Sequence, residues 1–140
     1  MAINHYTPFA NTPYADGLFY PKTTVTTVAT ATAVTLTAAE VLGGIVLQDP
    51  AGGSVTTTLP TAALMVAAMN GARIGTTVRF LIRNTADSSE TITVAAGTGG
   101  TTSGTMTIAQ SNTKEFLLRL TGVTEGSEAY YVYSIGTLTT

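Results

Sequence analysis

The amino-acid sequence predicts an all-β fold, an antiparallel β-sandwich or jelly roll of about nine short strands with one or two short helices and an extended N-terminal arm. Two observations predict this class. Apolar and polar residues alternate over short segments separated by turn-forming residues, which is the pattern of half-buried strands. Threonine fills 30 of the 140 positions, and its β-branched side chain suits the pleated surface of a sheet.

The clearest alternation lies between residues 76 and 96. In one strand, Val78, Phe80 and Ile82 alternate with Arg79, Leu81 and Arg83. In the next, Ile92 and Val94 alternate with Thr91, Thr93 and Ala95. A period of two places each apolar set on one face of a strand. The break at 84–89 is rich in short polar side chains that bond to their own backbone. We therefore expect these two strands to form an antiparallel hairpin.

Other strands are expected on both sides of this hairpin, at 23–28, 33–37, 45–48, 55–59, 105–109, 114–120 and 129–135. In the strand at 114–120, the period of two turns Phe116, Leu118 and Leu120 inward. The glycine-rich sequence at 97–104 lacks the ending of a phosphate-binding loop. We expect it to be a flexible surface turn.

Two short helices are expected, one between the strands at 33–37 and 45–48 and one after the strand at 55–59. Thr37 and Glu40 have the spacing of a capping box, and Gly43 supplies a stop, so one helical turn is predicted at 38–42. A second helix begins after Thr61 and ends before Gly71. Its larger side chains, Leu64, Met65 and Met69, fall on one side, which favours packing over the end of a sheet.

The length of 140 residues fits one domain, which we divide into an arm at 1–22 and a β-sandwich domain at 23–140. Three prolines in the arm argue against a helix or a regular ladder there. The arm nevertheless holds half of the aromatic residues, namely Tyr6, Phe9, Tyr14, Phe19 and Tyr20. These rings need a surface to cover them, either on their own domain or on a neighbouring subunit or larger assembly.

Charge and composition exclude several classes of function. The formal net charge is −2, and the six basic residues are not clustered, so no nucleic-acid partner is expected. No apolar run approaches the length of about 18 residues needed for a membrane-spanning helix, so no membrane is expected as a partner. The N-terminus lacks the pattern of a secretory signal, which predicts a soluble protein made in the cytoplasm of its host.

The sequence also offers little catalytic chemistry. The one histidine, His5, lies in the arm, and cysteine is absent. We therefore expect no enzyme, no catalytic residue and no cofactor. Two loop pairs of carboxylates, Asp87 with Glu90 and Glu125 with Glu128, lack the dense ligand spacing of a calcium loop. Solvated loop charge is favoured for both pairs over a metal site.

A mixed surface on two strands is the candidate interface, made of Arg79, Leu81, Arg83, Glu115, Leu117 and Arg119. Its partly apolar character fits a subunit contact, and an ordinary solvent-facing sheet with cross-strand ion pairs explains it equally well. Tyr130, Tyr131 and Tyr133 also leave alternatives open, since they fit a sugar site, a subunit contact or packing within a sheet.

Three segments of the second half of the chain have a distinctive sequence: VRFLIRNT at 78–85, TITVAAGTG at 91–99, and NTKEFLLR at 112–119. In these segments the chain resembles small structural proteins of tailed bacteriophages and other large DNA viruses. In that group, a Val-x-Phe-x-Ile-x-Asn-Thr strand, a Thr-x-Thr-Val-Ala-Ala-Gly-Thr-Gly segment and an Asn-Thr-x-x-Phe-x-x-Arg strand occur in the same order.

The resemblance implies a component of the virus particle. It implies a capsid decoration or cement protein that braces neighbouring major capsid proteins on the head shell, as a homotrimer, without catalytic residues. The arm at 1–22 would extend over the shell. Similar modules also occur in head fibres and tail fibres, so a fibre module that binds a host-surface glycan is the alternative.

Overall fold

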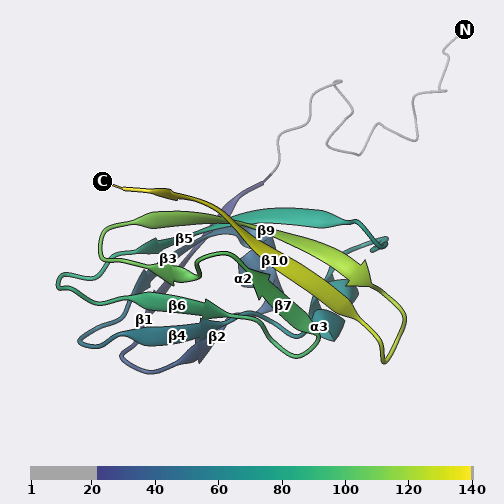
Figure 1. Cartoon of the computed structure of the whole chain (residues 1–140), viewed down its shortest axis with the longest axis horizontal. Coiled ribbons are helices and arrows are strands. Elements are labelled where there is room, and N and C mark those ends of the chain that lie inside the picture. Colours follow the sequence, from purple (N-terminus) through teal and green to yellow (C-terminus); the bar gives the residue numbers. More distant parts are fainter. Residues whose placement is uncertain (1–21, 140) are drawn as a thin grey trace, which may run out of the picture.

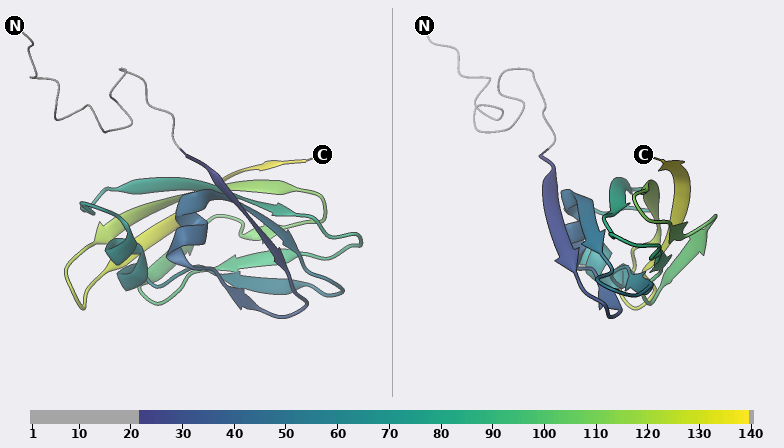
Figure 2. Two further views of the ribbon diagram at one scale, coloured as in Figure 1. Left: turned by 180° about the vertical axis from the view of Figure 1, so that it is seen from behind. Right: turned by 90° about the vertical axis from the view of Figure 1, so that its left-hand side faces the viewer.

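The computed structural model describes residues 22–139, which form a β-rich fold with two short helices. Two mixed sheets are stacked face to face (Figures 1 and 2). Sheet A has the strand order β1-β3-β5-β9-β10-β7, and sheet B has the order β2-β4-β6-β8. The strands are β1 (Thr24–Ala29), β2 (Val34–Thr35), β3 (Gly44–Asp49), β4 (Val55–Thr58), β5 (Thr77–Asn84), β6 (Ile92–Ala95), β7 (Gly100–Ser103), β8 (Thr107–Ile108), β9 (Thr113–Gly122) and β10 (Ala129–Leu138).

The chain winds between the two sheets. Each of β1, β3, β5 and β7 lies in sheet A and is followed by a strand of sheet B. Strands β1, β3 and β5 are therefore parallel to one another, as are β2, β4 and β6. Antiparallel pairs occur where β9 joins β5 and β10, and where β8 joins β6. The predicted predominance of strands is confirmed, whereas the antiparallel sandwich or jelly roll is not, because both sheets are mixed.

The expected hairpin between β5 and β6 is wrong. β5 lies in sheet A beside β3 and β9, and β6 lies in sheet B beside β4 and β8. Asn84 ends β5, and its amide Nδ2 donates hydrogen bonds to the carbonyl oxygens of Glu90 (2.9 Å) and Ile108 (3.1 Å). Its Oδ1 accepts from the backbone N–H of Ala86 at 3.0 Å. These bonds fix a corner that carries the chain across the sandwich.

Both helices begin as the sequence predicts. Thr37 caps α2 (Ala38–Gly43) in a complete capping box with Glu40, and Thr61 caps α3 (Ala62–Ala68). The two helices contact each other, and α2 also packs against β1, β3 and β5. The expected apolar side of α3 is correct for Met65 and Met69, which are buried, and wrong for Leu64, which is 57% exposed. Leu64 lies on the solvent side of the helix.

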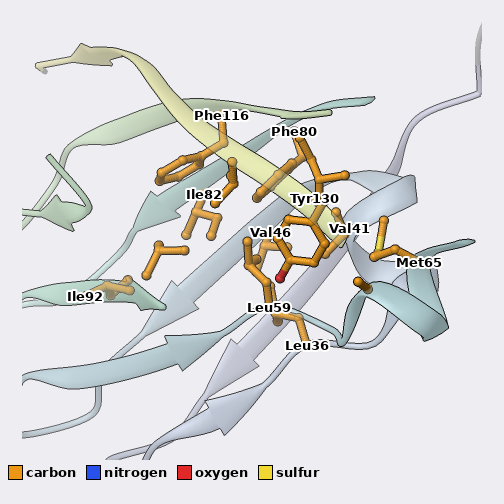
Figure 3. Packing of buried hydrophobic residues seen from close by; sticks show 14 of the residues in the cluster. Leu36, Val41, Val46, Leu59, Met65, Phe80, Ile82, Ile92, Phe116 and Tyr130 are labelled. Atoms are coloured by element: carbon orange, nitrogen blue, oxygen red, sulfur yellow. The ribbon is translucent and has the colours of Figure 1, made fainter. Parts of the chain in front are cut away.

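The core lies between the sheets and is closed at one end by the helices. Figure 3 shows Phe80 and Phe116 from sheet A, Ile92 from sheet B, and Met65 from α3 in one cluster. The rings of Phe80 and Phe116 stack with centroids 5.3 Å apart. Burial of such side chains stabilises the fold by about 1.5 to 3 kcal/mol each.

Buried polar groups link the two sheets. The hydroxyl of Thr57 in β4 donates to Gln48 Oε1 in β3 at 2.7 Å. The Nζ of Lys114 donates to the carbonyl oxygens of Thr105 and Thr107 at 2.7 and 2.8 Å. Lys114 is 3% exposed, and this burial lowers the pKa of its ammonium group. An unpaired buried polar group is costly, so these bonds specify how the sheets align.

The glycine-rich segment at 97–104 lies at the surface, as we expected, but half of it is a strand and not a turn. It contains β7, which pairs in parallel with β10 at the edge of sheet A. The backbone N–H of Tyr130 donates to the carbonyl oxygen of Gly99 at 3.1 Å, and that of Gly97 donates to the Tyr130 hydroxyl at 3.0 Å. The glycines at the start of the segment let this backbone approach the tyrosine closely, while 101–104 remain exposed.

Candidate functional site

The exposed side of sheet A is the candidate site. Along β5, β9 and β10, one set of alternating side chains points into the core and is buried, as the sequence predicts for Phe116, Leu118 and Leu120. The opposite set forms what we call the outer face, together with side chains of β1 and β3. Its apolar, aromatic and charged members include Val25, Ile45, Leu47, Arg79, Leu81, Arg83, Glu115, Leu117, Arg119, Tyr131 and Tyr133.

The structure brings all six residues of the predicted interface together. Because β5 and β9 are antiparallel neighbours, Leu81 lies opposite Glu115 and Arg79 lies opposite Leu117. The two mixed surfaces expected from the sequence are therefore one continuous surface. The six residues lie on one face of the β5–β9 pair. That this face is an interface remains a prediction.

One ion pair crosses the outer face. Arg79 Nη1 lies 2.7 Å from Glu115 Oε1, and the two residues are diagonal neighbours across the β5–β9 pair. Their side chains are 62% and 34% exposed, so solvent screens the attraction and the pair stabilises the fold by no more than about 1 kcal/mol. Arg83 and Arg119 lie on the same face, which gives it an excess of positive charge.

Two tyrosines extend the outer face onto β10. The rings of Tyr131 and Tyr133 stack with centroids 5.9 Å apart and an interplanar angle of 20°. In the register of β9 and β10, Tyr131 lies opposite Arg119 and Tyr133 lies opposite Leu117. Tyr130 differs from both because it points into the core (Figure 3). Of the three tyrosines in the described part of the chain, Tyr131 and Tyr133 are therefore the two available to a partner.

Strands β1 and β3 add apolar residues that our sequence analysis missed, among them Val25, Ile45 and Leu47. Val25, Ile45 and Leu81 form one row across the three parallel strands β1, β3 and β5. Val25 is 54% exposed. The alternation within each strand was visible in the sequence. The row across the strands was not visible, because it depends on parallel pairing of β1, β3 and β5, whereas we expected antiparallel sheets.

The outer face contains an open hollow where β1 begins. The hollow has a volume of about 210 Å³ and is lined by Thr23, Gly44, Ile45, Arg79, Phe80, Leu81 and Glu115. Gly44 has a φ of +98° because it is the left-handed C-cap of α2. A glycine is favoured at this position, and its missing side chain leaves the floor of the hollow open.

The described residues show little catalytic chemistry elsewhere. Over 22–139, no three or more His, Asp or Glu side chains gather where they could hold a metal ion. Glu90 differs from the solvated charge that we expected, since it is only 7% exposed. The same range contains no helix with the length and apolar character needed to cross a membrane.

The aromatic residues predicted to act as arm anchors lie outside the described residues. They are Tyr6, Phe9, Tyr14, Phe19 and Tyr20.

The comparisons with known proteins found no relative, since no protein-family model, no curated protein and no solved structure matches the chain. The outer face therefore has to be interpreted from its own chemistry.

Proposed function

We propose that this chain is a non-enzymatic structural protein of a virus particle. It decorates the capsid surface as a homotrimer and braces neighbouring major capsid proteins. The observation that carries the proposal is the outer face of sheet A, a partly apolar surface with aromatic and arginine side chains on a body of two packed sheets.

The composition of the outer face fits a protein partner. Protein interfaces are enriched in tyrosine and arginine. Leu81 and Leu117 lie near the middle of the outer face, on its two central strands, while Tyr131 and Tyr133 lie beside them on β10. A partner that covers the leucines would gain apolar contact, and an acidic partner rim would pair with Arg83 and Arg119.

The test is binding of the full-length chain to empty shells of the major capsid protein from the same source, measured by co-sedimentation. Leu81→Glu combined with Leu117→Glu should reduce the bound fraction at least tenfold. The control is Leu64→Glu, which makes the same Leu-to-Glu change once, at an exposed side chain of α3 outside the outer face. Unchanged binding of the double variant would refute the proposed role of this face.

A second candidate function follows from the stacked pair of Tyr131 and Tyr133. Partly exposed aromatic rings on the surface of a sheet offer an apolar platform on which a sugar ring can pack. A fibre module that binds host-surface glycans would use this platform. Tyrosine fluorescence during titration with purified host polysaccharide tests it, since the chain contains no tryptophan. A signal that is lost in Tyr133→Ser, with no binding to shells, would favour the fibre module.

A further inference from the structure

Within residues 22–139, no strand pairs with the outer edge of β1 in sheet A. Among the described residues, four strands lie at sheet edges, namely β1, β2, β7 and β8. Strands β2 and β8 have two residues each and β7 has four, whereas β1 has six. An edge strand presents unpaired N–H and C=O groups that can pair with another chain. β1 therefore offers the longest such edge.

The sequence of β1 does nothing to protect that edge. TVTTVA contains no charged residue and no proline, which are the usual devices that prevent pairing at an edge. Val25 is 54% exposed, and Thr24, Thr27 and Ala29 are exposed as well. The hollow beside Thr23 and Ile45 continues from this edge onto the outer face. A strand added to β1 would therefore gain both backbone hydrogen bonds and apolar contact.

The chain itself carries a segment suited to this position. Residues 14–20, YADGLFY, lie between Pro13 and Pro21 and contain no proline, so all their backbone N–H groups are available to a ladder. Three of the arm's five aromatic residues fall within this segment. Asp16 is its one charged residue and is opposite in sign to the arginine excess of the outer face.

The connection to β1 disfavours a return of the segment onto its own strand. A two-residue hairpin turn needs positive φ at its first central position, whereas Pro21 holds φ near −65°. The residue before a proline is pushed toward extended geometry, which applies to Tyr20. A three-residue turn would require Thr23 in the left-handed region, which is unfavourable for a β-branched residue. The nine residues from Tyr14 to Lys22 reach about 30 Å when extended.

We propose that residues 14–20 of one copy add a strand to the β1 edge of a second copy of this chain. Such an exchange leaves no free arm and no free edge only in a closed assembly, either a reciprocal swap of two copies or a ring of three or more. The proposal rests on the homotrimer of the proposed function and names the contact that would build it. It places the aromatic arm beside Val25 and the hollow of the neighbouring copy.

The first test is the mass of the full-length chain by light scattering, for the unmodified protein and two matched variants. Val25→Lys with Thr27→Lys places two charges on the outer side of β1. Thr101→Lys with Ser103→Lys places the same charges, at the same spacing, on β7 at the opposite edge of sheet A. We expect a trimer for the unmodified chain and the β7 variant, and a monomer for the β1 variant.

The second test changes the arm within the full-length chain. Leu18→Pro removes a backbone donor inside 14–20 and should give a monomer, whereas Ala10→Pro lies outside that segment and should leave the trimer intact. Circular dichroism checks that every variant keeps the β-rich body. A monomeric unmodified chain would overturn both the trimer and the exchange. The exchange alone would be overturned if the trimer survived the β1 change or Leu18→Pro. It would also be overturned if the trimer were lost equally in the β7 variant or in Ala10→Pro. Neither result depends on shell binding.

Discussion

A Cβ atom on Gly100 would lie 2.3 Å from Cζ of Tyr130, so the β7 backbone packs directly against the ring of this buried tyrosine. The Tyr130 hydroxyl accepts from the backbone N–H of Gly97 and donates to the carbonyl oxygen of Pro60 at 2.9 Å. One side chain of β10 thereby holds the loop before α3 and the start of β7. This contact fixes the edge of sheet A that lies opposite β1.

Gly100→Ala should destabilise the fold by about 1 to 3 kcal/mol, because the added methyl group has no space unless the ring or the strand moves. Urea unfolding followed by circular dichroism measures the effect. Gly136→Ala is the matched control, since it lies in β10 and a Cβ there would meet no atom within 4 Å. Equal unfolding midpoints for the two variants would contradict the close packing of Gly100.

Tyr130→Phe should cost about 1 to 3 kcal/mol at neutral pH, because the Gly97 N–H and the Pro60 carbonyl oxygen each lose their bond to the hydroxyl. Burial also raises the pKa of Tyr130 above its ordinary value near 10. Above pH 10 the unfolded state therefore binds fewer protons than the folded state. The stability that this group contributes is complete below pH 10 and falls as the pH rises toward the folded-state pKa.

The alkaline loss of stability should therefore be weaker in Tyr130→Phe than in the unmodified chain. Thermal unfolding between pH 8 and pH 11 measures this difference. Tyr131→Phe serves as the control, because it removes an exposed hydroxyl and retains Tyr130. The same pH profile for Tyr130→Phe and the unmodified chain would show that Tyr130 does not couple folding to proton binding.

Asn84→Asp should destabilise the fold by at least about 2 kcal/mol at neutral pH. The change replaces two amide donors with a carboxylate that faces the carbonyl oxygens of Glu90 and Ile108. Part of the loss should be recovered at acidic pH relative to the unmodified chain, because a protonated carboxyl group regains one donor. Asn70→Asp changes an exposed residue and should leave the urea midpoint within about 0.5 kcal/mol of the original. A comparable effect at position 70 would argue against the special role of the Asn84 corner.

The ion pair between Arg79 and Glu115 should contribute little to stability. A double-mutant cycle with Arg79→Ala and Glu115→Ala should give a coupling energy of about 0.2 to 1 kcal/mol that decreases with added salt. A coupling above about 2 kcal/mol that persists in high salt would indicate a desolvated pair. The outer face would then be covered in solution.

The period of two determined much of this fold without tertiary information. It placed Phe116, Leu118 and Leu120 in the core, and it set Leu81 and Leu117 on the outer surface. The capping box at Thr37 and the cap at Thr61 identified where both helices begin. Such features depend on neighbours within a few residues, so the sequence by itself specifies them.

Strand pairing and strand direction were decided by the tertiary structure. Alternation in β5 and β6 is the same whether they form a hairpin or face each other in separate sheets, since either arrangement buries the same side chains. The corner at Asn84 selects the second arrangement through bonds to Glu90 and Ile108, and the second of these is distant in sequence. Likewise, Gly97–Gly104 has the composition of a loose turn until Tyr130 packs against it. The outer face exists as one surface because long-range pairing aligns β1, β3, β5, β9 and β10.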